Sequence, residues 1–178
     1  MTNIAVLIGS PRKGGNTEAL AHSFIEGAKK RNNIEVISVT DIKINGCTGC
    51  NYCYKDQNHR CIQKDDMQEI YEKLAHAEII VVATPVFFYG VSSQLKCLID
   101  RLHNPVCNGF KVKKLVLLAV AADTTPTVFN SISTMYASVL KYFSLENGGA
   151  ITVPGVEKRG DIVCNHALKE AFDLGKNI

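Results

Sequence analysis

The sequence predicts an α/β fold, a three-layer sandwich in which a five-stranded parallel sheet lies between two layers of helices. Two observations support this prediction. Short apolar runs alternate with segments of helical periodicity, and most of these runs are continuous aliphatic or β-branched stretches. Parallel strands are covered on both faces, so they lack polar alternation. We expect residues 1–178 to form one domain, with a cysteine-rich insertion at about 45–62.

The apolar runs predict five strands: Ile4–Ile8, Val36–Val39, Ile79–Ala83, Leu115–Ala121 and Ala150–Val153. Apolar stripes at helical spacing predict five helices, running over Leu20–Ala28, Met67–Ala75, Leu95–Leu102, Phe129–Phe143 and Cys164–Ala171. Asp65 and Asp161 are the expected N-caps of the second and last helices. This alternation favours the flavodoxin strand order 2-1-3-4-5, with ligands bound at the carboxyl ends of the strands.

The overall composition argues against several classes of partner. The net charge is only +3, and the chain has no basic run or acidic tail, so a nucleic-acid partner is not expected. No apolar run approaches the length of a membrane span. The first residues lack the basic segment and cleavage site of a signal peptide, so we expect a cytoplasmic location and reduced thiols.

The loop after the first predicted strand, Gly9 to Thr17, has the composition of an anion site. It leaves a buried strand and enters a helix, an arrangement that directs backbone N–H groups and the positive helix end at one point. Ser10, Asn16 and Thr17 add short polar side chains, and Arg12 adds a guanidinium suited to phosphate. The glycine spacing fits a single phosphate monoester better than a triphosphate or dinucleotide. An ordinary βα turn remains the alternative.

The loop after the third predicted strand contains three consecutive aromatic residues, Phe87 to Tyr89. They cannot all face the core, and planar side chains stack well on a flat ring ligand. The alternative is that two are core residues and one lies on the surface.

The loop after the fourth predicted strand, Ala121 to Pro126, is small and polar. A loop that passes close to a ligand would have this composition, but an ordinary helix cap by Asp123 or Thr125 explains it nearly as well.

Four cysteines lie within 15 residues, with two, two and seven residues between them: Cys47, Cys50, Cys53 and Cys61. Four thiolates in a compact loop can hold an iron–sulfur cluster. Three alternatives stay open: a zinc site, a redox pair such as Cys50 with Cys53, and thiols that line a pocket without metal. The other three cysteines are expected to be inert: Cys97, Cys107 and Cys164.

Four groups of residues resemble the NADPH-dependent FMN reductase and iron–sulfur flavoprotein branch of the flavodoxin-like superfamily. They are Gly9-Ser10-Pro11-Arg12 with Gly15-Asn16-Thr17, Thr84-Pro85-Val86 with Phe88-Tyr89-Gly90, Lys96 with Ile99-Asp100-Arg101, and the cysteines leading into Asp65-Asp66-Met67.

The resemblance implies non-covalent FMN. The phosphate would be held by Ser10, Arg12, Asn16 and Thr17. The isoalloxazine would be lined by Pro85, Val86, Phe87 and Phe88, with Ala122, Asp123 and Thr124 on its far side. The four clustered cysteines would bind a 4Fe–4S cluster. The resemblance also implies a homodimer or homotetramer, with Lys96 and Arg101 serving that assembly or, equally, forming ordinary ion pairs on a helix face.

Three functions follow as hypotheses. The first is an iron–sulfur flavoprotein that passes electrons from a ferredoxin-like donor, through a 4Fe–4S cluster and FMN, to a small acceptor. The second is a cluster-free NAD(P)H-dependent FMN or quinone reductase. The third is a flavodoxin-like carrier with no turnover. We name no catalytic side chain, because the flavin itself would be the reactive centre.

Overall fold

The computed structural model describes residues 1–178 and confirms the predicted fold class. Five strands, all parallel, are ordered β2-β1-β3-β4-β5. The strands are β1 (Thr2–Ile8), β2 (Asn32–Ser38), β3 (Ile79–Pro85), β4 (Lys114–Val120) and β5 (Glu146–Val153).

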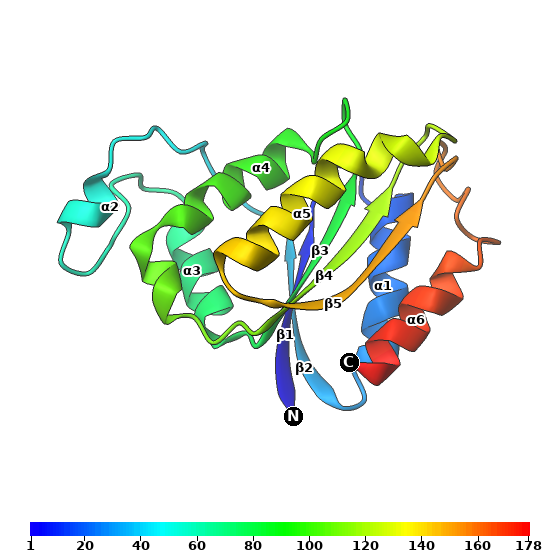
Figure 1. Ribbon diagram of the computed structural model, residues 1–178, viewed down its shortest axis with the longest axis horizontal. Coiled ribbons are helices and arrows are strands. Elements are labelled where there is room, and N and C mark those ends of the chain that lie inside the picture. The colour runs from blue at the N-terminus through cyan, green and yellow to red at the C-terminus, as the bar shows by residue number, and fades with distance from the viewer.

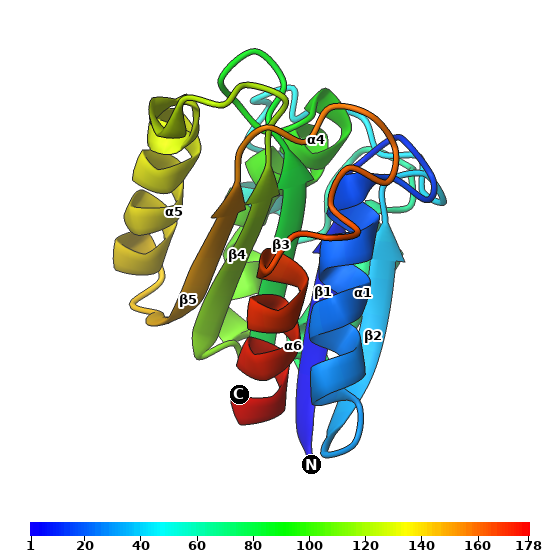
Figure 2. The ribbon, with the colours of Figure 1, turned by 90° about the vertical axis from the view of Figure 1, so that its right-hand side faces the viewer.

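Helices cover both faces of this sheet (Figures 1 and 2). The α-helices are α1 (Asn16–Ala28), α2 (Tyr52–Lys55), α3 (Met67–His76), α4 (Ser93–Asp100), α5 (Asn130–Tyr142) and α6 (Ala167–Asn177). Three short 3₁₀-helices are η1 (Arg101–His103), η2 (Pro105–Gly109) and η3 (Pro126–Phe129). None of these helices is long and apolar enough to cross a membrane.

The core consists of two apolar layers, one on each face of the sheet. Along β1, Ile4, Val6 and Ile8 pack toward α1 and α6, whereas Ala5 and Leu7 pack toward α3, α4 and α5. This alternation follows from the two-residue period of a strand. All five residues are almost fully buried, which explains why the central strands are continuous apolar runs in the sequence.

The two edge strands are longer than predicted. β2 begins at Asn32 rather than Val36, and β5 begins at Glu146 rather than Ala150. Each edge strand pairs with only one neighbour, and exposed polar residues such as Asn33 and Glu35 in β2 and Glu146 in β5 interrupt the apolar pattern at its start. The first half of β5 also carries an irregular register opposite β4, where Gly149 has φ of +117°.

The predicted start of the last helix is wrong. α6 begins at Ala167, and Cys164 lies in an exposed turn before it. Asp161 does not cap this helix, because its carboxylate accepts hydrogen bonds from the N–H groups of Glu157 and Lys158. The Asn165 side chain instead accepts from the N–H of Ala167.

Candidate functional site

One cavity of about 500 Å³ opens at the carboxyl ends of the strands, where the loops after β1, β3 and β4 meet. Its volume lies within the usual range for small-molecule sites. Nine of the residues singled out from the sequence line it: Ser10, Arg12, Asn16, Thr17, Pro85, Val86, Phe87, Phe88 and Ala122. The structure thus brings together side chains from three separate loops, and their cofactor contacts remain predictions.

The N-terminal end of α4 holds the loop after β1 in place. The buried Ser92 hydroxyl donates a hydrogen bond to the Gly9 carbonyl and accepts one from the N–H of Leu95. A Cβ atom on Gly9 would lie 2.5 Å from the Leu95 side chain, so only glycine lets the strand end this close to α4. These contacts fix where the loop enters the cavity.

The N-terminus of α1 faces this cavity without a side-chain cap. Gly15 occupies the N-cap position and provides no side chain to bond the first turn. The N–H groups of Asn16, Thr17 and Glu18 have no hydrogen-bond partner within the protein. Open N–H groups together with the helix dipole form a site for an anion.

Cations dominate the charged lining of the cavity. Arg12, Lys13 and Arg159 contribute positive charge against the single carboxylate of Glu157. Lys13 is engaged elsewhere: it pairs with Asp41 at 2.8 Å, and the hydrogen bond to Asp41 raises the Lys13 pKa. Neither arginine forms an ion pair in the protein, so two guanidinium groups are available to a ligand.

Asn16 lies at the cavity, but its side chain is committed to another segment. Its Nδ2 donates to the Lys158 carbonyl at 2.9 Å, and its Oδ1 accepts from the N–H groups of Gly160 and Ile162 at 3.1 and 3.5 Å. A contact between Asn16 and a phosphate would therefore use its backbone N–H. The side chain fastens the loop between β5 and α6 to the start of α1.

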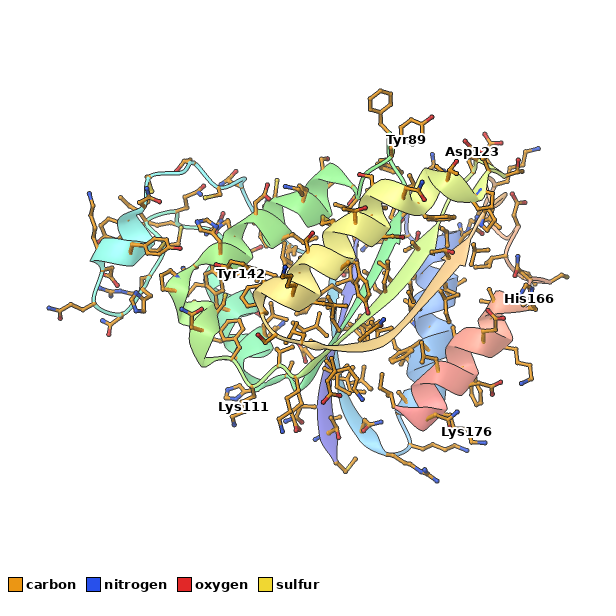
Figure 3. All side chains as sticks on the ribbon, viewed as in Figure 1. Tyr89, Lys111, Asp123, Tyr142, His166 and Lys176 are labelled. Atoms are coloured by element: carbon orange, nitrogen blue, oxygen red, sulfur yellow. The ribbon has the colours of Figure 1, made fainter.

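The aromatic loop after β3 forms a tight turn at the rim of the cavity. Phe87 and Gly90 exchange two backbone hydrogen bonds, which place Phe88 and Tyr89 at the tip with φ of +47° and +64°. All three aromatic side chains are exposed, Phe88 almost completely at 98%. Figure 3 shows Tyr89 projecting outward from the same end of the molecule as Asp123. The alternative that two of these rings belong to the core is therefore wrong.

The loop after β4 enters the cavity only at its start. Ala122 lines the cavity, but Asp123 and Thr124 do not. The Asp123 carboxylate accepts from the N–H of Thr125 at 2.7 Å, a bond that lowers the Asp123 pKa. Asp123 thus makes an ordinary turn contact before η3, and neither Asp123 nor Thr125 forms the side-chain helix cap that was the alternative explanation of this loop.

The loop after β5 also lines the cavity, a contribution that the sequence did not predict. Val156, Glu157 and Arg159 from this loop line the cavity. The signal was available, because the carboxyl end of β5 lies at the same edge of the sheet as the ends of β1, β3 and β4.

A second cavity of about 310 Å³ lies between α5, η2 and the sheet. Nineteen of its 21 lining residues are hydrophobic. It has few polar groups to orient a ligand and lies away from the loops described above, so we assign no cofactor to it.

The cysteine segment extends beside α3 and α4, away from the sheet (Figure 1). Cys47 and Cys50 are exposed, while Cys53 and Cys61 are half-buried. Burial raises the pKa of Cys53, and the charges of the other three thiolates act in the same direction, so all four lie in one neighbourhood. No three of them converge as metal ligands do. The donor chemistry fits an iron–sulfur cluster or zinc, but the four sulfurs would have to move closer together to ligate either one.

Arg101 contacts both ends of the cysteine segment. Its side chain is only 2% exposed and pairs with Asp65, while its Nη1 donates to the Asn45 carbonyl at 3.3 Å. Asp65 also accepts from the N–H groups of Asn45 and Met67. Arg101 thus forms an ion pair, as the alternative predicted, but a buried one rather than one on an exposed helix face, and its role in subunit assembly stays a prediction. Lys96 forms the ordinary surface pair, with Asp100.

Parallel strands in the order 2-1-3-4-5, with a cavity at their carboxyl ends, are typical of flavodoxin-like proteins. The sequence profile of the NADPH-dependent FMN reductase family matches residues 2–137, and the chain belongs to this family. The predicted resemblance to this family is therefore confirmed.

Several curated relatives are named iron–sulfur flavoproteins. One from Methanocaldococcus jannaschii is 40% identical over 66% of this chain and 60% of its own length. Another, from Methanosarcina thermophila, is 39% identical over 55% of this chain and 51% of its own. The chain thus spans about half to three fifths of the length of these relatives.

Two further proteins match nearly the whole chain. A putative NAD(P)H-dependent FMN-containing oxidoreductase of Bacillus subtilis is 28% identical over 97% of this chain and 96% of its own. The structure of an NAD(P)H:quinone oxidoreductase from Methanothermobacter marburgensis superposes with a TM-score of 0.80 at 18% identity, covering 99% of this chain and 96% of its own. At that identity the structural match establishes the fold alone.

Proposed function

We propose that this chain is an FMN-dependent oxidoreductase that transfers electrons from a reduced donor, NAD(P)H or a ferredoxin-like protein, to a small acceptor. The observation that supports it best is the uncapped N-terminus of α1, which faces a cavity of about 500 Å³ together with the unpaired Arg12. Bound FMN would supply hydride or two-electron acceptance and single-electron release.

The chain's own residues would bind and orient this cofactor. The open N–H groups of α1 and the Arg12 guanidinium would hold the phosphate. Pro85, Val86 and Phe87 would cover one side of the ring and exclude water, and Ala122 would leave room on the other. No side chain is required to transfer protons in this proposal.

Flavin binding and reduction test this function. The purified protein should bind FMN, and NADPH or NADH should bleach the flavin bands under anaerobic conditions. Arg12→Ala should weaken FMN binding by about 1.5–3 kcal/mol, the value of a charged hydrogen bond. Lys30→Ala, beyond the far end of α1, is the control. Unchanged affinity in Arg12→Ala would remove Arg12 from the site, and a flavin that neither nucleotide bleaches would exclude NAD(P)H as donor.

We further propose that Cys47, Cys50, Cys53 and Cys61 hold a 4Fe–4S cluster, which when bound would supply one-electron chemistry. Support comes from the four neighbouring thiols and from the names of the relatives. Anaerobically purified protein should then contain about four irons and four sulfides per chain. Stoichiometric zinc without sulfide would contradict this proposal.

A cluster-free NAD(P)H-dependent reductase is the second candidate. It is favoured by the lack of any three thiols placed as metal ligands and by the similarity to the Bacillus subtilis protein over 97% of this chain. Flavin bands alone, even after attempted cluster reconstitution, would support this candidate. A homodimer or homotetramer and a cytoplasmic location remain predictions, and light scattering coupled to gel filtration tests the first of these.

A further inference from the structure

We propose that Arg159, in the loop between β5 and α6, is a second guanidinium that binds the phosphate of FMN and lets the site discriminate FMN from riboflavin. This inference rests on the proposed function. It adds a residue from a part of the chain that lies 142 residues beyond the phosphate loop it faces.

The Arg159 guanidinium lies directly against the phosphate loop. Gly14, in that loop, has φ of +66°, and a Cβ atom built on it would lie 2.2 Å from Arg159 Nη2 and 2.8 Å from Cζ. Any side chain at position 14 would therefore displace the guanidinium. Glycine at this position serves both the left-handed backbone and the close approach of Arg159.

The backbone on both sides of Arg159 is fixed to α1. Lys158 and Gly160 bond the same Asn16 side chain, and Asp161 closes the turn by accepting from the N–H of Lys158 at 2.7 Å. Ile162 is fully buried just beyond. Figure 2 shows this segment crossing the N-terminal end of α1 before the chain enters α6. Arg159 therefore lines the cavity from a loop whose backbone is held by hydrogen bonds on both sides of it.

The charge of the cavity also favours an anion. Arg12 and Arg159 have no carboxylate partner, Lys13 is paired with Asp41, and Glu157 offsets one positive charge. A phosphate monoester carries about −1.5 to −2 charges at neutral pH. Two planar guanidinium groups beside open helix N–H groups match its oxygens, whereas the neutral end of riboflavin would leave both arginines without a partner.

The test compares FMN with riboflavin on the purified chain, freed of bound flavin, by flavin fluorescence titration. Arg159→Ala should weaken FMN binding about tenfold or more, the equivalent of one charged hydrogen bond, and leave riboflavin binding unchanged. Arg159→Lys should recover part of the loss, because it keeps the charge without the fork of donors. Lys158→Ala, next in the same loop, should bind both flavins as the unaltered protein does.

Three results would overturn the inference. FMN affinity that is unchanged in Arg159→Ala but reduced in Arg12→Ala would remove Arg159 and leave the proposed function intact. Equal losses of FMN and riboflavin would mean that Arg159 only supports the loop. An unaltered protein that binds neither flavin would overturn the proposed function itself, and this inference with it.

Discussion

Arg101 is the single charged residue among the buried residues of the chain. Its partner Asp65 is also nearly inaccessible, with 5% of its side chain exposed. The Nε atom of Arg101 has no hydrogen-bond partner within the protein, so the guanidinium depends on Asp65 and on the Asn45 carbonyl. A buried charge that loses its partner is far more costly than an exposed one.

Asp65→Asn should therefore destabilise the chain by about 3–5 kcal/mol in urea unfolding, because it leaves the Arg101 charge buried and unpaired. Lys96→Ala is the matched control, because it breaks the neighbouring ion pair between Lys96 and Asp100. These two side chains are 48% and 43% exposed, respectively. The control should cost at most about 1 kcal/mol. Equal losses in the two variants would show that the Arg101 charge reaches water.

The same pair predicts a pH dependence. Burial raises the pKa of Asp65, but hydrogen bonds from Arg101, Asn45 and Met67 outweigh it and hold the pKa below 3.8. The folded state then binds fewer protons than the unfolded state in acid. The stability from Asp65 is complete above pH 3.8 and is lost as the pH falls through the lowered folded-state pKa. Urea unfolding between pH 7 and 2.5 should show a shallower acid loss in Asp65→Asn than in the unaltered protein.

At the scale of elements, the turn after β3 keeps an unfavourable backbone. Phe88 and Tyr89 both have positive φ, a conformation that costs a non-glycine residue about 1–2 kcal/mol. Their rings contact each other edge to face, with 5.9 Å between the ring centroids, and most of the surface of both side chains is exposed. Strain of this kind concentrates at functional sites, which agrees with the position of Phe88 at the rim of the cavity.

Tyr89→Gly should raise the free energy of unfolding by about 0.5–1 kcal/mol. Relief of the strained φ exceeds the extra entropy that glycine gives the unfolded chain, about 0.5–1 kcal/mol. Tyr89→Val is the matched opposite, because a β-branched residue tolerates positive φ least. It should lower stability in the same urea experiment. The same change in both variants would mean that the turn relaxes in solution.

Predictability from the sequence also differs by element. The central strands were found because helices bury them on both faces, which leaves continuous apolar runs. The edge strands were found only in part, because Asn33 and Glu35 in β2 and Glu146 in β5 face solvent. The phosphate loop was recognised from local composition. The commitment of Asn16 to residues 158–162 could not be, because it depends on contacts across 142 residues or more.

At the scale of the whole molecule, α1 and α6 join the two ends of the chain on one face of the sheet (Figure 2). Their closest approach is at Gly27 and Gly175. A Cβ atom on Gly27 would lie 2.0 Å from the Phe172 carbonyl oxygen, and one on Gly175 would lie 2.1 Å from that of Phe24. The helices therefore touch backbone to backbone, and this contact holds α6 where the loop carrying Arg159 ends.

Gly27→Ala should destabilise the molecule by about 1–3 kcal/mol in urea unfolding. Helix propensity alone predicts the opposite, since alanine is favoured over glycine by about 1 kcal/mol inside a helix. The clash is with backbone atoms of α6, which no side-chain rotation can relieve, so the two helices must separate and lose packing. Gly109→Ala is the matched control, because no atom lies within 4 Å of its added Cβ, and it should change stability little. A Gly27→Ala variant that is more stable than the unaltered protein would show that α6 shifts at no cost. The position of Arg159 would then depend on the contacts within its own loop and with Asn16, not on the packing of α6.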